Sequence, residues 1–182
     1  MGERLLLVGM MGSGKSTVAR LAADRLGWAW IDTDEMVVRA TGSSVADLFS
    51  HHGEARFREE EAAAIASALE GDEAMVVSVG GGAVLDPANR DRLKAGGTVV
   101  WLRARPETLV ERVGDGAGRP LLAGDSRQAR EETLRTLERA RRSLYAEVAT
   151  EIVDVDGLDA GTVADRLVDA VGFDAPGREA RR

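Results

Sequence analysis

Short apolar runs alternate along the chain with segments in which apolar residues recur at helical spacing. The run Arg4–Val8 (RLLLV) is apolar almost throughout and ends at Gly9, which is typical of a strand buried on both faces. In Lys15–Leu26 the apolar residues form one helical stripe, and Gly27 ends the segment. The expected strands are Arg4–Val8, Trp28–Ile31, Met75–Val79, Thr98–Leu102 and Glu151–Val155.

Capping residues mark where several of the intervening helices begin. Ser44 is followed by Asp47 in a spacing that resembles a helix-capping arrangement. Asp86 suits an N-cap, and Pro87 suits the first turn of the helix after it. The expected helices are Lys15–Leu26, Glu35–Ala40, one opening at Ser44, Glu54–Leu69, one opening at Asp86-Pro87, Pro106–Val113, Gln128–Val148 and Thr162–Val171.

This order of elements predicts an α/β fold. Strands separated by helices favour a five-stranded parallel sheet flanked by helices, with right-handed crossovers. We expect a single domain over residues 1–172 and a disordered tail over residues 173–182. Ligands bind such sheets beyond the carboxyl ends of the strands. Candidate chemistry therefore follows Val8, Ile31, Val79 and Leu102.

Composition narrows the functional classes. The chain has 182 residues, of which 44% are hydrophobic and 30% charged, enough for a core without a metal or disulfide staple. A net charge of −7 argues against binding to nucleic acid or to anionic membranes. The chain contains no cysteine, and no apolar run approaches the length of a membrane span. A soluble, cytoplasmic protein is expected.

The segment Gly9–Ser16 (GMMGSGKS) carries the strongest signal. It fits the phosphate-binding pattern G-x-x-x-x-G-K-[ST], with an expected strand before it and a helix after it. The backbone N–H groups of such a loop surround phosphate oxygens, Lys15 adds a cation, and the Ser16 hydroxyl suits Mg²⁺. Lys15 is one of only two lysines in the chain. The alternative is a glycine-rich turn that caps a helix.

Asp32-Thr33-Asp34 follows the second strand. If the chain stays extended, the two carboxylates point the same way, and one can serve Mg²⁺ while the other orients an acceptor hydroxyl. The alternative is a pair of helix-capping aspartates. Gly80, Gly81 and Gly82 follow the third strand and permit close backbone approach to a ligand, or they form a flexible turn.

Several further positions are candidates. Arg58 and Glu61 share a helical face. Glu61 either holds the Arg58 guanidinium in place for binding or forms an ordinary solvated ion pair with it. Phe49 and Phe57 suit core packing. The glycine-rich loop Gly114–Asp125 carries Arg119 and suits a mobile lid over a phosphoryl-transfer site, or an ordinary surface loop. Arg112 and Arg141 lie on charged helices, where exposure is expected.

Taken together, these segments resemble the shikimate kinase family over about Leu5 to Val171. The resemblance rests on GMMGSGKST (9–17), DTD (32–34), TGSSVADLF (41–49), GEARFREEE (53–61), GGGAV (80–84), RPLLAG (119–124) and RARRSLY (139–145). It implies a monomeric P-loop kinase that transfers the terminal phosphoryl group of ATP to the 3-hydroxyl of shikimate.

The family's residue roles map onto matching positions. The resemblance implies that Gly12, Ser13, Gly14, Lys15, Ser16, Thr17, Arg112 and Arg119 bind ATP, and that Ser16 and, through water, Asp32 hold Mg²⁺. Asp34, Lys15 and Arg119 are the implied catalytic residues, with Asp34 taking the hydroxyl proton. Asp34, Arg58, Gly80, Gly81, Gly82, Arg141, Phe49 and Phe57 are the implied shikimate-binding residues, the glycines through their N–H groups.

Two departures from the family's pattern leave details open. Ser143 stands where a proline usually precedes Leu-Tyr, so either Arg141 or Arg142 could bind the carboxylate. The segment 156–160 (DGLDA) lacks a proline that is common on the adenine side. A gluconate kinase or another small-molecule or nucleotide kinase of this fold remains an alternative, as does a nucleotide-dependent switch, although no NKxD guanine-binding motif occurs.

Overall fold

A computed structural model describes residues 2–114, 120–122 and 126–172 of the protein. Its strands form a five-stranded sheet in the order β2-β3-β1-β4-β5, in which all neighbouring strands run parallel. The predicted α/β fold is confirmed. The strands are β1 (Arg4–Val8), β2 (Ala29–Asp32), β3 (Met75–Ser78), β4 (Thr98–Arg103) and β5 (Glu151–Asp154).

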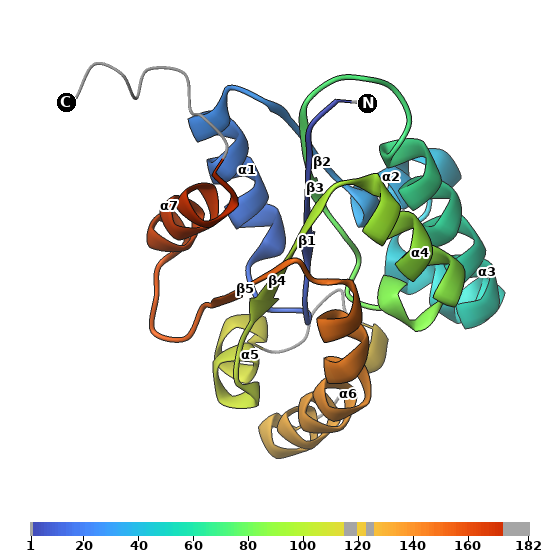
Figure 1. The fold of residues 1–182 in the computed structure, drawn as a ribbon. Coiled ribbons are helices and arrows are strands. Elements are labelled where there is room, and N and C mark those ends of the chain that lie inside the picture. The colour runs from blue at the N-terminus through green and yellow to red at the C-terminus, as the bar shows by residue number, and fades with distance from the viewer. Residues whose placement is uncertain (1, 115–119, 123–125, 173–182) are drawn as a thin grey trace.

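Helices cover both faces of this sheet. Figure 1 shows α1 and α7 side by side on one face, while α3 and α4 lie on the other. Helix α5 packs against α6 near the carboxyl edge of the sheet. The helices are α1 (Lys15–Leu26), α2 (Thr33–Thr41), α3 (Val45–Ala68), α4 (Pro87–Gly96), α5 (Pro106–Val113), α6 (Arg127–Val148) and α7 (Ala160–Val171), with 3₁₀ turns η1 (Ala83–Leu85) and η2 (Pro120–Leu122).

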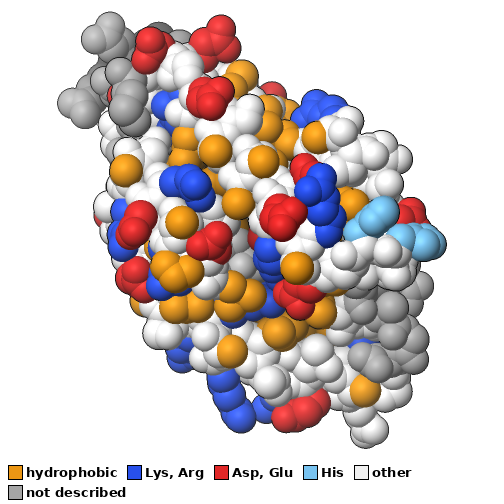
Figure 2. Space-filling model, turned by 90° about the vertical axis from the view of Figure 1, so that its right-hand side faces the viewer, with side chains coloured by type: hydrophobic (Ala, Val, Ile, Leu, Met, Phe, Trp, Pro, Cys, Tyr) orange, Lys and Arg blue, Asp and Glu red, His pale blue; other side chains and the backbone are white. Residues whose placement is uncertain are grey.

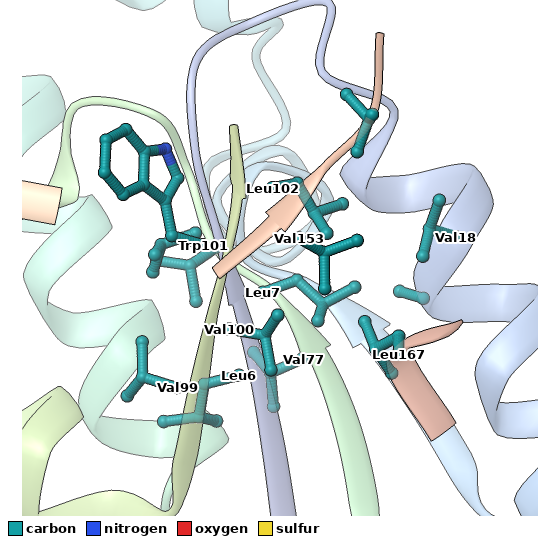
Figure 3. Packing of buried hydrophobic residues seen from close by; sticks show 14 of the residues in the cluster. Leu6, Leu7, Val18, Val77, Val99, Val100, Trp101, Leu102, Val153 and Leu167 are labelled. Atoms are coloured by element: carbon teal, nitrogen blue, oxygen red, sulfur yellow. The ribbon is translucent and has the colours of Figure 1, made fainter. Parts of the chain in front are cut away.

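The core follows from the apolar strands. All five residues of the central strand β1 are buried, because helices cover the sheet on both sides. Side chains of β4 alternate between the two faces, as Figure 3 shows for Val99 and Trp101 on one side and Val100 and Leu102 on the other. Both layers of helices thus share one hydrophobic cluster with the sheet.

The chain turns into α2 earlier than the sequence pattern predicted. The helix expected at Glu35 begins at Thr33, and β2 extends to Asp32. The cause is the Asp32 side chain, whose Oδ1 accepts the Asp34 N–H at 2.9 Å and so caps the helix. Asp34 therefore lies in the first helical turn rather than in an extended segment.

The two helices expected at Ser44 and over Glu54–Leu69 form the single bent element α3. Gly53 breaks it with φ 79° and ψ 168°, a backbone conformation essentially confined to glycine. The Ser44 cap is confirmed, since Ser44 Oγ accepts the Asp47 N–H at 3.1 Å. The expected break between the two helical segments is thus present as a kink.

The capped start of α4 is also as predicted, with Asp86 as N-cap and Pro87 in the first turn. The last helix begins at Ala160 rather than at Thr162, because Asp159 caps it by accepting the Thr162 N–H at 3.0 Å. No helix in the described part of the chain is both long and apolar enough to cross a membrane.

Charged side chains of both signs are interspersed over the face shown in Figure 2. The two histidines, His51 and His52, are exposed at the edge of this face, at the end of the first segment of α3.

Candidate active site

A cavity of about 810 Å³ opens at the carboxyl edge of the sheet. It is lined by the loop after β1, the starts of α1 and α2, both segments of α3, the loop after β3, and parts of α5, α6 and α7. Most residues predicted from the sequence line it: Gly12, Ser13, Gly14, Lys15, Ser16, Thr17, Asp32, Asp34, Phe49, Phe57, Arg58, Gly81, Gly82, Arg112 and Arg141. Gly80 does not line it, and Arg119 lies outside the described residues.

The loop after β1 needs glycine at three positions. Gly9, Gly12 and Gly14 all have positive φ values, of 146°, 82° and 93°. A methyl group on Gly9 would lie 2.6 Å from the Leu102 carbonyl oxygen, so the loop can pass this closely over β4 only without a side chain. Gly14 then caps α1, whose N-terminus points into the cavity with its positive dipole end.

Lys15 is held across this loop. Its Nζ donates to the carbonyl oxygens of Gly9 at 2.9 Å and Met10 at 3.0 Å. The ammonium group therefore lies at the mouth of the loop, where it can meet the outer phosphates of a nucleotide.

Ser16, Asp32 and Ser78 bring three oxygen-bearing side chains together. Ser16 Oγ donates to Asp32 Oδ2 at 2.6 Å and lies 3.4 Å from Ser78 Oγ. Asp32 is buried, and its other oxygen caps α2. The capping and functional interpretations of Asp32 are thus compatible. A hydroxyl and a carboxylate at this spacing suit a hard cation such as Mg²⁺. Ser78 was not singled out from the sequence, because only the register of β3 against β2 reveals it.

Asp34 and Glu61 face the same backbone position from two helices. A methyl group on Gly80 would lie 2.7 Å from Asp34 Oδ1 and 2.5 Å from Glu61 Oε1. Gly80 is therefore required because two carboxylates occupy the space beside its Cα. Both carboxylates are among the residues that line the cavity, so they place negative charge on the same part of its wall.

Arg58 is fixed between two carboxylates of α3. Its guanidinium contacts Glu61 Oε2 at 2.6 Å and Glu54 Oε1 at 2.9 Å. Glu61 is only 1% exposed, so the solvated-ion-pair alternative is wrong. Burial raises the pKa of Glu61, attraction to Arg58 partly offsets this, and repulsion from Asp34 adds to it. Arg58 thus presents a fixed cation to the cavity.

The three glycines after β3 have different neighbours. A methyl group on Gly81 would lie 3.1 Å from the Gly9 carbonyl oxygen, and one on Gly82 would overlap the Arg58 guanidinium. The Gly80 N–H donates to Thr33 Oγ1 at 2.9 Å. The expectation that all three N–H groups line the acceptor site therefore needs correction at Gly80, whose N–H is bonded to a neighbouring helix.

Helix α6 places Arg141, and not Arg142, in the cavity. Arg141 is 3% exposed and donates from Nη1 to the Gly81 carbonyl oxygen at 3.1 Å. The Arg142 side chain is 64% exposed and pairs with Glu138 at 2.8 Å. The prediction that Arg141 is exposed is therefore wrong. The two arginines differ because their side chains project from α6 in different directions.

Two phenylalanines form an apolar wall. The ring centroids of Phe49 and Phe57 are 4.8 Å apart. Phe57 is buried in a small cluster with Val37 and Leu48, while Phe49 is half-buried at the cavity. Core packing and cavity lining are therefore joint roles of this pair.

Arg112 joins the loop after β5 to the phosphate-binding loop. Its Nη2 donates to the carbonyl oxygens of Val155 and Leu158, each at 3.0 Å, and its Nη1 to that of Ser13 at 3.4 Å. Although Arg112 is exposed as expected, it binds backbone carbonyl groups of the phosphate-binding loop and of the loop after β5.

Fold and site define the class: a P-loop kinase, with a phosphate-binding loop at the end of a central parallel strand and an acceptor pocket beside it. The family model for shikimate kinase matches residues 11–172. A shikimate kinase of Symbiobacterium thermophilum is 48% identical over 147 residues, 80% of this chain and 82% of that protein. One of Moorella thermoacetica is 43% identical over 94% of this chain and 95% of its own.

Among solved structures, shikimate kinase from Acinetobacter baumannii in complex with shikimate superposes with a TM-score of 0.89 at 33% identity, covering 94% of this chain and 93% of that one. The chain belongs to the shikimate kinase family. The family and enzyme class predicted from the sequence, an ATP-dependent kinase, are confirmed.

Proposed function

We propose that the protein transfers the terminal phosphoryl group of ATP to the 3-hydroxyl of shikimate, giving shikimate 3-phosphate and ADP. One observation carries the proposal: the phosphate-binding loop with Lys15 and the pocket formed by Asp34, Arg58 and Arg141 line the same cavity. A hydroxylated acid held by the two arginines places its hydroxyl group between Asp34 and the loop. Direct transfer requires this proximity.

Each side chain has a proposed part in the reaction. Arg58 and Arg141 bind the carboxylate, a task that suits planar guanidinium groups. Asp34 orients the hydroxyl and accepts its proton as the oxygen–phosphorus bond forms. The bond from phosphorus to the bridging oxygen breaks, and ADP leaves with that oxygen. Lys15 stabilises the charge on the transferring group.

Magnesium is part of this proposal. The 2.6 Å spacing of Ser16 Oγ and Asp32 Oδ2 suits a hard cation, which Ser16 would hold directly and Asp32 through water. When bound, the ion neutralises charge on the nucleotide phosphates. We further propose that Arg119, from the predicted lid over 114–125, contributes a second cation to ATP.

The two halves of the site come from one chain, which supports a monomeric enzyme in our proposal. A single domain over residues 1–172 also stays a prediction, as does a cytoplasmic enzyme with no nucleic-acid partner. Analytical ultracentrifugation with and without both substrates tests the monomer.

A coupled ADP-release assay tests the proposed reaction. We expect ADP release to require shikimate and Mg²⁺, and mass spectrometry should identify the product as shikimate 3-phosphate. The variant Asp34→Asn should still bind ATP but lose most of its turnover. Gluconate and nucleoside monophosphates serve as rival acceptors. Transfer to one of these in preference to shikimate would assign another kinase activity, and nucleotide binding without any transfer would favour a switch.

A further inference from the structure

The Gly80–Gly82 loop has no side chains with which to hold its own position. The Asp34 and Glu61 carboxylates occupy the space beside Gly80, and the Arg58 guanidinium occupies the space beside Gly82. Gly81 lies against the backbone of the phosphate-binding loop, where a Cβ atom would be 3.1 Å from the Gly9 carbonyl oxygen. A backbone without Cβ atoms has more accessible conformations than any other, so ordering it is costly. Its position must therefore come from groups on neighbouring elements.

Thr33 holds the first peptide of this loop. Its Oγ1 accepts the Gly80 N–H at 2.9 Å, although the two residues are 47 positions apart in sequence. Thr33 is completely buried at the first position of α2. It lies between Asp32 and Asp34, so this bond fixes the loop relative to both aspartates.

Tyr145, on helix α6, holds the peptide between Gly81 and Gly82. Its hydroxyl donates to the Gly81 carbonyl oxygen at 2.6 Å and lies 3.6 Å from Met10 Sδ in the phosphate-binding loop. The ring is buried and stacks on Trp101 with centroids 5.6 Å apart. Burial raises the pKa of Tyr145 to about 12, so the hydroxyl keeps its proton and remains a donor at neutral pH.

The Gly81 carbonyl receives a second donor from α6. Arg141 Nη1 lies 3.1 Å from the same oxygen, one helical turn from Tyr145. The carbonyl thus orients Arg141, while Tyr145 fixes the carbonyl. Because the peptide between Gly81 and Gly82 is planar, holding its oxygen also fixes the direction of the Gly82 N–H.

We propose that Thr33 and Tyr145 are positioning residues whose buried hydroxyls hold the Gly80–Gly82 backbone in place between Asp34, Arg58 and Arg141. The acceptor then meets a preformed loop instead of ordering a flexible one. This inference rests on the proposed function, since it concerns the binding of the same acid. Neither side chain lines the cavity, so neither is a catalytic residue.

Variants that remove only a hydroxyl test the proposal. Tyr145→Phe keeps the ring and its packing on Trp101, and Thr33→Val keeps the branched shape. We expect each variant to lower kcat/KM for shikimate by about tenfold, because one buried hydrogen bond is lost and the loop backbone that it held becomes less ordered. The KM for ATP should stay within about twofold of wild type, and Thr33→Ser should restore kcat/KM.

Thr150→Val is the matched control. Thr150 Oγ1 also bonds backbone, accepting the Val99 N–H at 2.8 Å, but it does so where β5 begins, away from the carboxyl edge. This variant should lower the melting temperature without changing either substrate's kinetic constants. A loss in Thr150→Val like that in Tyr145→Phe would overturn the proposal, because any loosening of the sheet would then suffice.

The double variant Thr33→Val/Tyr145→Phe provides a second readout. If both hydroxyls hold one loop, the combined loss in kcat/KM for shikimate should differ clearly from the product of the single losses. Calorimetric binding of shikimate to Tyr145→Phe decides the matter if Thr33→Val does not fold, with weakened binding expected.

Unchanged shikimate constants in Tyr145→Phe, or equal losses for ATP and shikimate, would overturn the proposal. A wild-type enzyme that does not phosphorylate shikimate would instead refute the proposed function.

Discussion

At the scale of single residues, Gly82 shows how a missing side chain makes room for a functional one. Its φ of −94° and ψ of −10° suit any amino acid, so backbone strain does not require glycine there. What requires it is the Arg58 guanidinium, which occupies the space that a Cβ atom would fill.

Gly82→Ala should therefore leave the protein folded and displace only the end of a flexible arginine. We expect kcat/KM for shikimate to fall by about tenfold to a hundredfold, the range for lost hydrogen bonds to a charged group, while the KM for ATP is unchanged. Steady-state kinetics with each substrate varied in turn measures this. Arg56→Ala is the control for charge on this helix, because Arg56 pairs with Glu59 and Glu60 and does not line the cavity. A drop in melting temperature with unchanged shikimate kinetics would contradict the steric explanation.

Glu61 leads to a prediction about pH. Burial raises its pKa above the ordinary value of 4.5, so the folded protein binds this proton more tightly than the unfolded chain does. The resulting stability is complete below pH 4.5 and is lost as the pH rises through the folded-state pKa. We expect the free energy of unfolding of wild type to decline over this range relative to Glu61→Gln. Urea denaturation of both proteins at several pH values measures the difference, and parallel pH profiles would contradict it.

Some residues of the site could be predicted from the sequence, and others could not. Lys15 and Ser16 were predictable because the phosphate-binding loop is a local motif whose neighbours in sequence are its neighbours in space. Thr33 and Tyr145 were not, because their loop partners are 47 and 64 positions away. Arg141 and Arg142 could not be separated either, since adjacent helical residues differ only in direction and the packing of α6 decides which one is buried.

At the scale of elements, the bend in α3 positions the apolar wall. Its first segment carries Phe49 and its second carries Phe57, and the rings meet across the kink at Gly53. The sequence predicted two helices here, one opening at the Ser44 capping arrangement and one over Glu54–Leu69. That the two segments run on as one bent element was not predictable, because it depends on how α3 packs against α2.

Gly53→Ala should lower the free energy of unfolding by roughly 1–3 kcal/mol, because its φ of 79° and ψ of 168° are accessible essentially to glycine alone. Among the residues that the structure describes, no atom lies within 4 Å of the position that the new methyl group would occupy, so the expected loss comes from backbone strain and not from a clash with them. Chemical denaturation measures it. His52→Ala, an exposed neighbour, should change stability by less than about 0.5 kcal/mol. Equal free energies of unfolding for wild type and Gly53→Ala would contradict this explanation, because a side chain at position 53 would then cause no backbone strain.

The loop after β5 is held to helix α5 at both ends of that helix. Asp156 Oδ1 accepts the Arg105 N–H at 3.0 Å at the start of α5, and Arg112 binds the loop carbonyls near its end. These contacts stabilise the segment 156–160 (DGLDA), whose contacts the sequence resemblance left open.

Asp156→Asn should weaken nucleotide binding, because the amide is uncharged and holds Arg105 less firmly. We expect the KM for ATP to rise by about threefold to tenfold with shikimate kinetics unchanged. Asp154→Asn is the matched control: Asp154 pairs with Arg103 on the neighbouring strand and does not reach the loop. ADP titration calorimetry measures the effect directly. A similar weakening in both variants would indicate a general effect of charge at this edge.

At the scale of the whole molecule, the strand order distributes the chemistry across the sheet. Central β1 leads into the phosphate-binding loop, β2 and β3 on one side lead into Asp34 and the glycine loop, and β4 and β5 on the other lead toward Arg112 and Asp156. The parallel sheet itself was predictable from alternating strands and helices. Its order was not, because apolar runs of similar composition do not specify their neighbours.

This arrangement predicts that substitutions in the shikimate-binding part and in the nucleotide-binding part of the site have independent effects on the kinetic constants. Arg58→Ala should raise the KM for shikimate by the same factor in wild type as in an Asp156→Asn background, since distant sites without shared partners have additive effects. Arg58→Ala with Glu61→Gln is the positive control for coupling, because these side chains touch at 2.6 Å and their effects cannot be additive. Kinetic cycles over the four variants of each pair measure both terms. Strong coupling in the Arg58–Asp156 cycle would mean that the two halves move together, so that the sheet transmits changes in one pocket to the other instead of holding both in fixed positions.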